Sequence, residues 1–550
     1  MVSLSSARAL GLVGLVVGLV GCGDRAEAPA RASAPAGSVL TVERRRHDPL
    51  AAARLRTEVV NLDAAVPPYC YATTAGGANP CATCHTAGRG RNLLDDADLQ
   101  GSYAFADSAR VNPWHNLFVD RRGEVAAIAD ADLLAWIRED NYRPLMAALA
   151  SAGPDYPGFR PDLDLDDGFD RDGFARDGSG WRAVRYQPVP GHGWPTNGSY
   201  GDAFLRLPAA FTHAATGAPD RALARLNYAL VEAAVTASDG PIDRPVEPVD
   251  ERLVGVDLDG DGALGAAATR IRRLPARYAG AAATEAVIAG ALPRGTELLH
   301  TVRYVDPDAP DLAARRLKEL RYARKLEVLD AWGLSRAYGE AADEKSEGVV
   351  PVRQGSPEAG YLNGYGWQLQ GFIEDAAGHL RVQTAEEHAY CLGCHGGLGA
   401  TVDHTFAIAR KVPGADGWRP QDLRGLRDRP AGAASTPEAA TYLARVGGGD
   451  DFRANREMLA RFFPDGVLDR AAVARAAVAG DRDLAWLAAP SRARALALGK
   501  AYLAIVREQS FARGRDAVLA PIARAHREIV DEDTGLSEHI ERSTGLVPRW

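Results

Sequence analysis

The sequence predicts a mainly α fold with extensive irregular loops and small β elements. Apolar residues recur at helical spacing in several long stretches, whereas Gly, Pro and Asp concentrate between them. Alternating apolar patterns are few and short. With 46% hydrophobic and 25% charged residues, the 550-residue chain has the composition of a globular protein that buries a large core without disulfides.

The N-terminal residues predict export. An apolar run at 9–20 is too short for a permanent transmembrane helix and follows Arg8. The tetrapeptide Leu19-Val20-Gly21-Cys22 has the form of a lipobox, so we expect a signal peptide at 1–21 and lipidation of Cys22; an ordinary signal peptide is the alternative. Residues 22–47 predict a flexible tether. Because Gly23 follows the cysteine and an aspartate does not, we expect a periplasm-facing protein, anchored by lipid in the cell envelope at the outer membrane.

Four of the six cysteines form a repeated motif, C-x-x-C-H, which occurs at 81–85 and at 391–395. Two thiols at this spacing reach both vinyl groups of one porphyrin, and the following imidazole is then held beneath the iron. A zinc site does not need a histidine after each second cysteine, and a redox pair does not need to occur twice. The motifs therefore predict two covalently bound haem c groups, attached through Cys81, Cys84, Cys391 and Cys394 and ligated by His85 and His395.

With these two motifs and the lipobox, the chain resembles the di-haem c-type cytochromes of bacterial envelopes. Three stretches, WPTNGSYGDAFLRLP, LLHTVRYVD and WQLQGFIED, more loosely resemble uncharacterised proteobacterial di-haem lipoproteins. That likeness extends through most of the chain but implies no known reaction. The motifs lie 310 residues apart, farther than in compact di-haem peroxidases, and this departure argues against a peroxidase.

After the tether we expect a first haem region at 48–215, a helical and acid-rich middle region at 216–345, a second haem region at 346–415 and a helical C-terminal region at 416–550. Helical spacing predicts helices within 124–151, at 220–236, at 311–332 and over most of 434–531. The basic side chains of 311–332 predict a solvated face or contacts with haem propionates. Two short alternating runs, WQLQGFIE and HLRVQ, predict a hairpin, and AEEHAYCLGCH predicts a helix that carries the second motif at its end.

An acidic loop in the middle region allows a calcium site. Asp257, Asp259 and Asp261 alternate as in the first half of an EF-hand loop, and Gly262 permits the sharp turn. The twelfth position holds Ala268 where a bidentate Glu is usual. A second acidic stretch lies at 162–177. In both places the alternative is an acidic turn kept soluble by Asp and Gly.

The distal ligands of the two irons are expected to be histidines. Besides Met1 there are two methionines, and both lie in helical patterns where methionine usually fills the core. His300 shares a strand face with Leu298 and Val302, and we expect His526 to share a helical face with Ile522 and Ile529. These two histidines are the predicted ligands; His115, His388 and His404 are alternatives.

Cys70 is left over from these assignments. It could be a buried free thiol beside the first haem, a thiolate near the iron, or, if Cys22 carries no lipid, the partner of Cys22 in a disulfide.

These observations favour an electron carrier with redox partner proteins in the envelope and a membrane contact through its lipid. A net charge of −8 without a basic block excludes a nucleic-acid partner. The alternative is a di-haem oxidoreductase with one open haem acting on a small molecule, and a haem-bearing subunit of a larger complex is a third reading.

Overall fold

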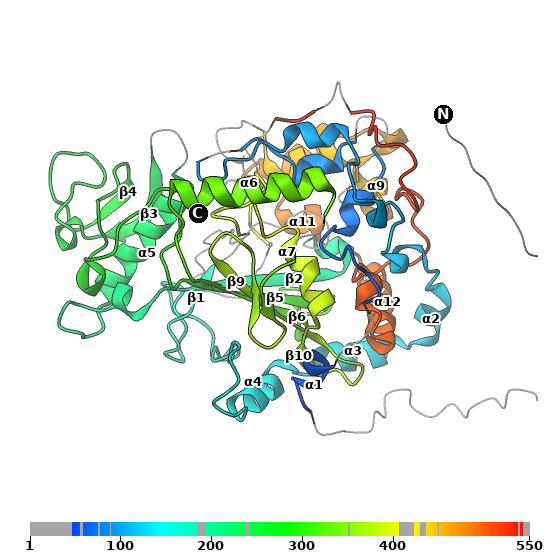
Figure 1. The fold of residues 1–550 in the computed structure, drawn as a ribbon, viewed down its shortest axis with the longest axis horizontal. Helices are drawn as coiled ribbons and strands as arrows, with labels where there is room; N and C mark the ends of the chain where they lie inside the picture. The colour runs from blue at the N-terminus through cyan, green and yellow to red at the C-terminus, as the bar shows by residue number, and fades with distance from the viewer. Residues whose placement is uncertain are drawn as a thin grey trace, which may run out of the picture. The chain divides into compact units, whose positions relative to one another are not determined.

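An antiparallel sheet forms the centre of the fold in the computed structural model of this protein (Figure 1). The structure describes residues 47–55, 59–74, 78–88, 90–184, 194–237, 242–349, 352–405, 423–428, 436–448, 450–536 and 540–542. Eight strands form the sheet, in the order β1-β2-β5-β6-β9-β8-β7 with β10 paired to β9. These strands are β1 Arg182–Val184, β2 Ser199–Arg206, β5 Glu297–Val305, β6 Ala313–Lys325, β7 Gly355–Ser356, β8 Gly360–Leu362, β9 Trp367–Glu374 and β10 Leu380–Val382. A separate pair consists of β3 Arg244–Val249 and β4 Ala268–Ile271.

Helices surround this sheet. They are α1 Ala51–Arg54, α2 Arg122–Ala127, α3 Asp130–Arg138, α4 Tyr142–Ala150, α5 Arg221–Thr236, α6 Ala331–Glu347, α7 Ala385–Leu392, α8 Glu438–Val446, α9 Arg456–Phe462, α10 Arg470–Ala474, α11 Leu484–Ala488 and α12 Arg492–Glu508. Helix α5 begins where the Asp220 side chain accepts the backbone N–H groups of Ala222 and Leu223, which caps its first turn. The helices predicted within 124–151 and at 220–236 are confirmed, as are the hairpin of β9 with β10 and the helix before the second motif.

The predicted mainly α fold class is wrong, because the eight-stranded sheet makes this a mixed α and β fold. The largest error is the stretch 311–332, which was expected to be a helix and contains the long strand β6 instead. Both faces of β6 are covered, so its apolar residues do not show a clean alternation. Its charged residues are not a solvated face either. Arg316, Lys318 and Lys325 are each at most 3% exposed and have polar partners in the interior.

The two faces of the sheet pack against different cores. On one face, Leu299, Leu320 and Phe372 pack with the apolar side of α4. On the other face, Trp367 and Leu369 belong to the same cluster as α5 and as Leu392 of the second C-x-x-C-H motif. Residues of β6 that alternate with Leu320, among them Arg321 and Ala323, lie on this second face. The sheet thus forms a rigid wall behind the second motif.

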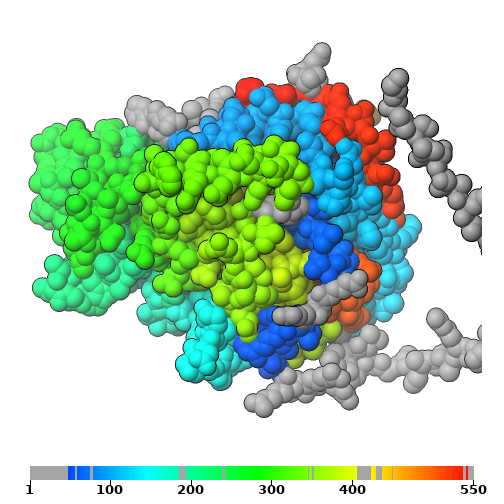
Figure 2. Space-filling view, in the orientation of Figure 1, coloured from blue at the N-terminus to red at the C-terminus, as the bar shows by residue number. Residues whose placement is uncertain are grey.

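The C-terminal segment after α12 is extended, and the helix expected around His526 is wrong. This segment runs against the chain around the first motif through isolated bridges that join Ala525 to Ala72, Glu528 to Val111 and Asp533 to Ser102. Figure 2 shows the red C-terminal residues lying against the blue residues near the N-terminus of the described chain. Backbone hydrogen bonds to a distant segment replace the helical ones, which a local apolar pattern does not reveal.

Residues Glu43–Trp550 form one compact unit. The four regions expected between residues 48 and 550 are therefore parts of one body. Among the described residues, no helix is long and apolar enough to cross a membrane.

Candidate functional site

The first C-x-x-C-H motif begins on a 3₁₀ helix, Pro80–Thr83, and continues into the loop that follows it. The Asn79 side chain accepts the Ala82 N–H and donates to Gln100 Oε1 at 2.8 Å, which fixes the start of this turn. The backbone N–H of His85 donates to the Cys81 carbonyl at 2.8 Å. This single turn therefore holds the two cysteines and the histidine of the motif in one continuous bend.

The second motif begins in the last turn of helix α7. The helix starts with a capping box in which Thr384 and Glu387 each bond the other's backbone N–H. At its end the His395 N–H donates to the Cys391 carbonyl at 3.1 Å, which is the same backbone bond as in the first motif. A side chain at Gly393 would collide with the Ala65 carbonyl, so this glycine allows the N-terminal loop to touch the motif.

The structure brings the two motifs together. A side chain at Gly399, just after the second motif, would collide with the Thr86 carbonyl, just after the first. Asn92 Nδ2 donates to Thr401 Oγ1 at 3.0 Å in the same region. Burial and then the neighbouring Cys394 raise the pKa of the Cys84 thiol well above its ordinary value, so cysteines of the two motifs lie within range of each other's charge.

The motif cysteines are largely buried. Burial raises the pKa of the Cys81 thiol to about 11 and that of Cys394 to about 12, so both thiols are largely removed from water. All four motif cysteines nevertheless keep part of their surface accessible. Ala82 and Leu392, at the second position of each motif, are packed in the core at 2% and 8% exposure. The cysteines of both motifs are thus less tightly enclosed than the residues between them.

The two motif histidines have different partners. His85 Nδ1 lies 3.8 Å from Asp96 Oδ2, and the Asp96 side chain is 2% exposed. A carboxylate facing the second ring nitrogen orients an imidazole and strengthens it as a metal ligand. Burial and the Arg321 charge lower the pKa of His395 to about 3, so this imidazole is neutral and able to bind a metal. The residues present at both motifs thus fit haem attachment and axial ligation.

His300 is placed on the face of the sheet that lies behind the second motif. It pairs across strands with Arg321, whose charge acts on the Cys391 thiol and on His395. The strand predicted around His300 is confirmed as β5.

His526 lies near the first motif, although it is not in a helix. Its Nε2 is 3.3 Å from the Tyr103 hydroxyl, and the two rings meet edge to face at 5.0 Å. The pKa of Tyr103 is raised by burial and also by the Cys81 charge, which places this tyrosine close to the first motif.

Two of the three alternative histidines, His115 and His388, are less suited to ligation. His115 is exposed. His388 uses both ring nitrogens, because Nε2 accepts the Gly371 N–H at 2.9 Å and Nδ1 donates to the Thr384 carbonyl at 2.8 Å. His404 stacks on Tyr365 at 4.4 Å and its Nε2 lies 2.8 Å from the Tyr338 hydroxyl.

Cys70 lies beside the motif cysteines and forms no disulfide with a described residue. Burial and the charges of Cys394 and Cys81 raise the pKa of its thiol far above the ordinary value, which makes it unreactive. Cys22, with which a disulfide was the alternative, is outside the described residues, and so is the whole lipobox.

The sequence did not point to Asp451 as a site residue, and it indicated Arg321 only as one of the basic side chains of 311–332 that could contact haem propionates. Asp451 is 1% exposed, accepts a hydrogen bond from the Tyr442 hydroxyl at 3.2 Å, and has its pKa raised to about 8 by burial and by Asp450. Its charge acts on Cys70 and on both cysteines of the first motif. The position of Arg321 could be found only once 313–325 is recognised as a strand.

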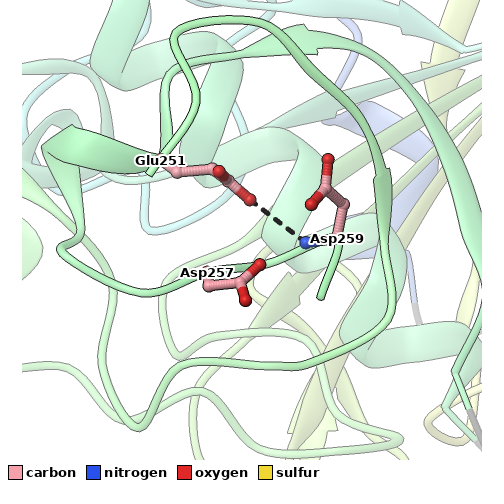
Figure 3. A group of neighbouring side chains, drawn as sticks. All are labelled: Glu251, Asp257 and Asp259. Atoms are coloured by element: carbon pink, nitrogen blue, oxygen red, sulfur yellow. Dashed lines mark hydrogen bonds between the residues drawn. The ribbon is translucent and has the colours of Figure 1, made fainter. Parts of the chain in front are cut away.

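The acidic loop forms a separate cluster, shown in Figure 3. Oxygen atoms of Glu251, Asp257 and Asp259 lie within 4.8 Å of one another. Glu251 Oε1 accepts the N–H groups of Leu258 and Asp259 at 2.7 and 3.1 Å. Asp261 is not part of the cluster; its Oδ1 accepts the Ala263 N–H. Glu251 precedes the loop and adds a third carboxylate to it, which the loop pattern alone could not reveal. Calcium binding there stays a prediction.

Comparisons with known proteins define the class. A lipoprotein family model matches residues 54–467, so the chain belongs to this family of lipoproteins, and lipoproteins are anchored in the cell envelope. An uncharacterized lipoprotein of Aquifex aeolicus (strain VF5) is 31% identical over 510 residues, which are 82% of this chain and 85% of that protein. No solved structure matches the chain. The lipoprotein part of the expected resemblance is thereby confirmed; neither comparison refers to a di-haem cytochrome.

Proposed function

We propose that this lipoprotein is a di-haem c-type cytochrome that transfers single electrons between redox partner proteins of the cell envelope. The observation that supports this proposal best is the convergence of the two C-x-x-C-H motifs, which are 310 residues apart in the sequence and adjacent in the fold. Two motifs without a shared function would not be expected to lie side by side in the fold. Two attached cofactors that exchange electrons need this proximity.

Haem, when bound, supplies an iron that cycles between the ferrous and ferric states. The chain's own residues set the conditions for that cycle. The negative charge of Asp96, 3.8 Å from His85, favours the ferric state, whereas the positive charge of Arg321 near His395 favours the reduced state. We expect the first haem to have the lower reduction potential, so that the two cofactors differ.

His300 and His526 are the proposed distal ligands, one for each site. His300 adjoins the second motif through Arg321, and His526 adjoins the first through Tyr103. Two strong axial ligands on each iron favour electron transfer over substrate chemistry.

A redox titration followed by electron paramagnetic resonance tests this function. In the fully oxidised protein we expect two low-spin ferric signals broadened by mutual interaction, and two separate one-electron transitions. The Cys394→Ala variant should retain one sharp signal. Two unbroadened signals, each unaffected by the redox state of the other haem, would contradict the proposal.

A di-haem oxidoreductase is the second candidate. It is favoured by the small number of suitable distal histidines in the described chain, because His115 is exposed and His388 is already fully bonded. A wild-type protein with one high-spin haem that reacts rapidly with peroxide would support this candidate against the carrier.

The proposed location is the periplasmic side of the outer membrane, with the lipid on Cys22. Metabolic labelling with palmitate should mark the wild type and the Cys70→Ala control, and it should not mark Cys22→Ala. A labelled Cys22→Ala variant would refute lipidation at this cysteine.

A further inference from the structure

A pocket of about 440 Å³ lies between helix α9, helix α12 and the segment 515–524, and its lining carries an excess of positive charge. Six arginines and one lysine line it, against two aspartates. Arg456 and Arg524 are exposed, whereas Lys318 and Arg515 are buried at 2% and 7% exposure. Of the two buried groups, Arg515 pairs with Glu319 at 3.0 Å, and burial lowers the pKa of Lys318 to about 7. The free positive charge of the pocket therefore comes from its other arginines, and such charge attracts small anions.

The two aspartates neutralise only part of this charge. Burial raises the pKa of Asp450 to about 6 and that of Asp516 to about 6. Asp450 accepts the Ala454 N–H at 2.9 Å, and Asp516 accepts a hydrogen bond from the Tyr69 hydroxyl at 3.2 Å. Neither forms an ion pair with an arginine of this lining among the described residues.

Arg453 is the residue that points most directly to a ligand. Its side chain is 6% exposed, and its Nη2 donates to the Thr73 carbonyl and hydroxyl oxygens. Its Nε and Nη1 have no hydrogen-bond partner in the described part of the chain. A buried guanidinium whose N–H groups lack hydrogen-bond partners destabilises the folded protein, and an oxygen anion would supply those partners.

Arg494, in helix α12, also lines the pocket. Its Nε donates to the Thr196 carbonyl at 2.6 Å, and burial lowers its pKa. It has no carboxylate ion-pair partner among the described residues. Arg453 and Arg494 thus line one cavity together with Asp450, whose single carboxylate acts on both guanidinium groups. The remaining positive charge favours an oxygen anion, which guanidinium groups bind well.

The pocket shares a wall with the motif cysteines. Tyr69 and Asp450 line the pocket. The residues that follow them in the chain, Cys70 and Asp451, lie close enough to the motif cysteines to affect the pKa of a motif thiol, that of Cys84. The Tyr69 ring packs on Phe452 at 5.3 Å, which closes this wall. Whatever binds in the pocket is separated from the motifs by one layer of residues.

We propose that this pocket binds the carboxylate or phosphate-type oxygens of an anion through Arg453 and Arg494. Such oxygens have two sources: a small diffusible anion, or the propionate groups of a haem attached at the neighbouring motifs. The second source rests on the proposed function, whereas the first does not.

Isothermal titration calorimetry of the purified full-length protein with inorganic phosphate, sulfate and succinate tests the first source. We expect at least one of these probes to bind, and Arg453→Gln and Arg494→Gln each to weaken binding about tenfold or more. Arg336→Gln, which alters an exposed residue of α6 paired with Glu340, is the matched control and should leave binding unchanged. Melting temperatures of all variants identify any that fail to fold, and Arg494 serves if Arg453→Gln does not fold.

Resonance Raman spectroscopy of the haem propionate modes tests the second source on the same proteins. If no probe binds, the Arg453→Gln and Arg494→Gln variants should shift these modes and the control should not. No binding of any probe together with unchanged propionate modes would overturn the proposal. Haem content, measured separately by mass, distinguishes this failure from a failure of the proposed function, because anion binding to a haem-free protein would still support the pocket.

Discussion

Asn92 and Thr401 join the two halves of the candidate site: Asn92 Nδ2 donates to Thr401 Oγ1 at 3.0 Å and also bonds the Thr401 carbonyl. Both side chains are 3% exposed. Asn92 follows the first motif histidine by seven residues, and Thr401 follows the second by six. One buried amide therefore connects the segments that leave the two motifs.

We expect the Asn92→Ala substitution to lower the free energy of unfolding by about 1–3 kcal/mol, because it leaves buried polar groups of Thr401 unpaired. Urea unfolding followed by circular dichroism measures this loss. In the double variant with Thr401→Val, the loss of unfolding free energy should be smaller than the sum of the losses in the two single variants. Strict additivity would show that the two residues do not act together.

Replacing either proposed distal ligand should change one haem only. His300→Ala and His526→Ala each remove an imidazole, so half of the low-spin ferric signal should convert to a high-spin signal, and the reduced variant should bind carbon monoxide. His379→Ala is the control, since His379 stacks on His47 at 4.6 Å and is neither a predicted nor an alternative ligand. Unchanged spectra in both variants would reject these two residues as ligands.

The thiol count tests the fate of all six cysteines. If four cysteines carry haem and Cys22 carries lipid, the denatured protein should react with Ellman's reagent at one thiol, that of Cys70. The folded protein should react at none, because burial raises the pKa of that thiol. A count of zero after denaturation would indicate the Cys22–Cys70 disulfide, and a count of five would exclude thioether attachment.

His388 should make the fold sensitive to acid. Burial lowers its pKa from 6.5 to about 4, so between these values the unfolded chain binds a proton that the folded chain does not. Its contribution to stability is complete above pH 6.5 and is lost as the pH falls toward 4. Between pH 7 and 4.5 the wild type should lose about 2–3 kcal/mol more than His388→Gln in urea unfolding. Parallel losses in the two proteins would contradict this assignment.

Local signals predicted the elements that are held by local interactions. Helix α5 has both an apolar stripe and the Asp220 cap, and the turn between β9 and β10 carries Asp375, whose side chain accepts the N–H groups of Ala377 and His379. The attachment motifs were visible for the same reason, because each is contained in five consecutive residues.

Elements whose stability comes from distant contacts were missed. Strand β6 contains charged residues whose sequence pattern is typical of a solvated helix. In the structure these residues are buried and have partners far away in the sequence; Lys325, for example, lies 3.0 Å from Asp403. The segment around His526 takes its backbone hydrogen bonds from residues more than 400 positions away, such as that from the His526 N–H to the Tyr71 carbonyl at 2.8 Å. For the same reason the sequence did not reveal Glu251, the place of Arg321 on a strand or the proximity of the two motifs.

The haem content of the protein tests the central claim most directly. After expression with a cytochrome c maturation system, intact mass and the pyridine haemochrome spectrum should show two covalently bound haems per chain. Cys84→Ala and Cys394→Ala should each impair attachment at their own motif, while Cys70→Ala retains both haems. A wild-type protein that carries no covalent haem under these conditions would contradict the account.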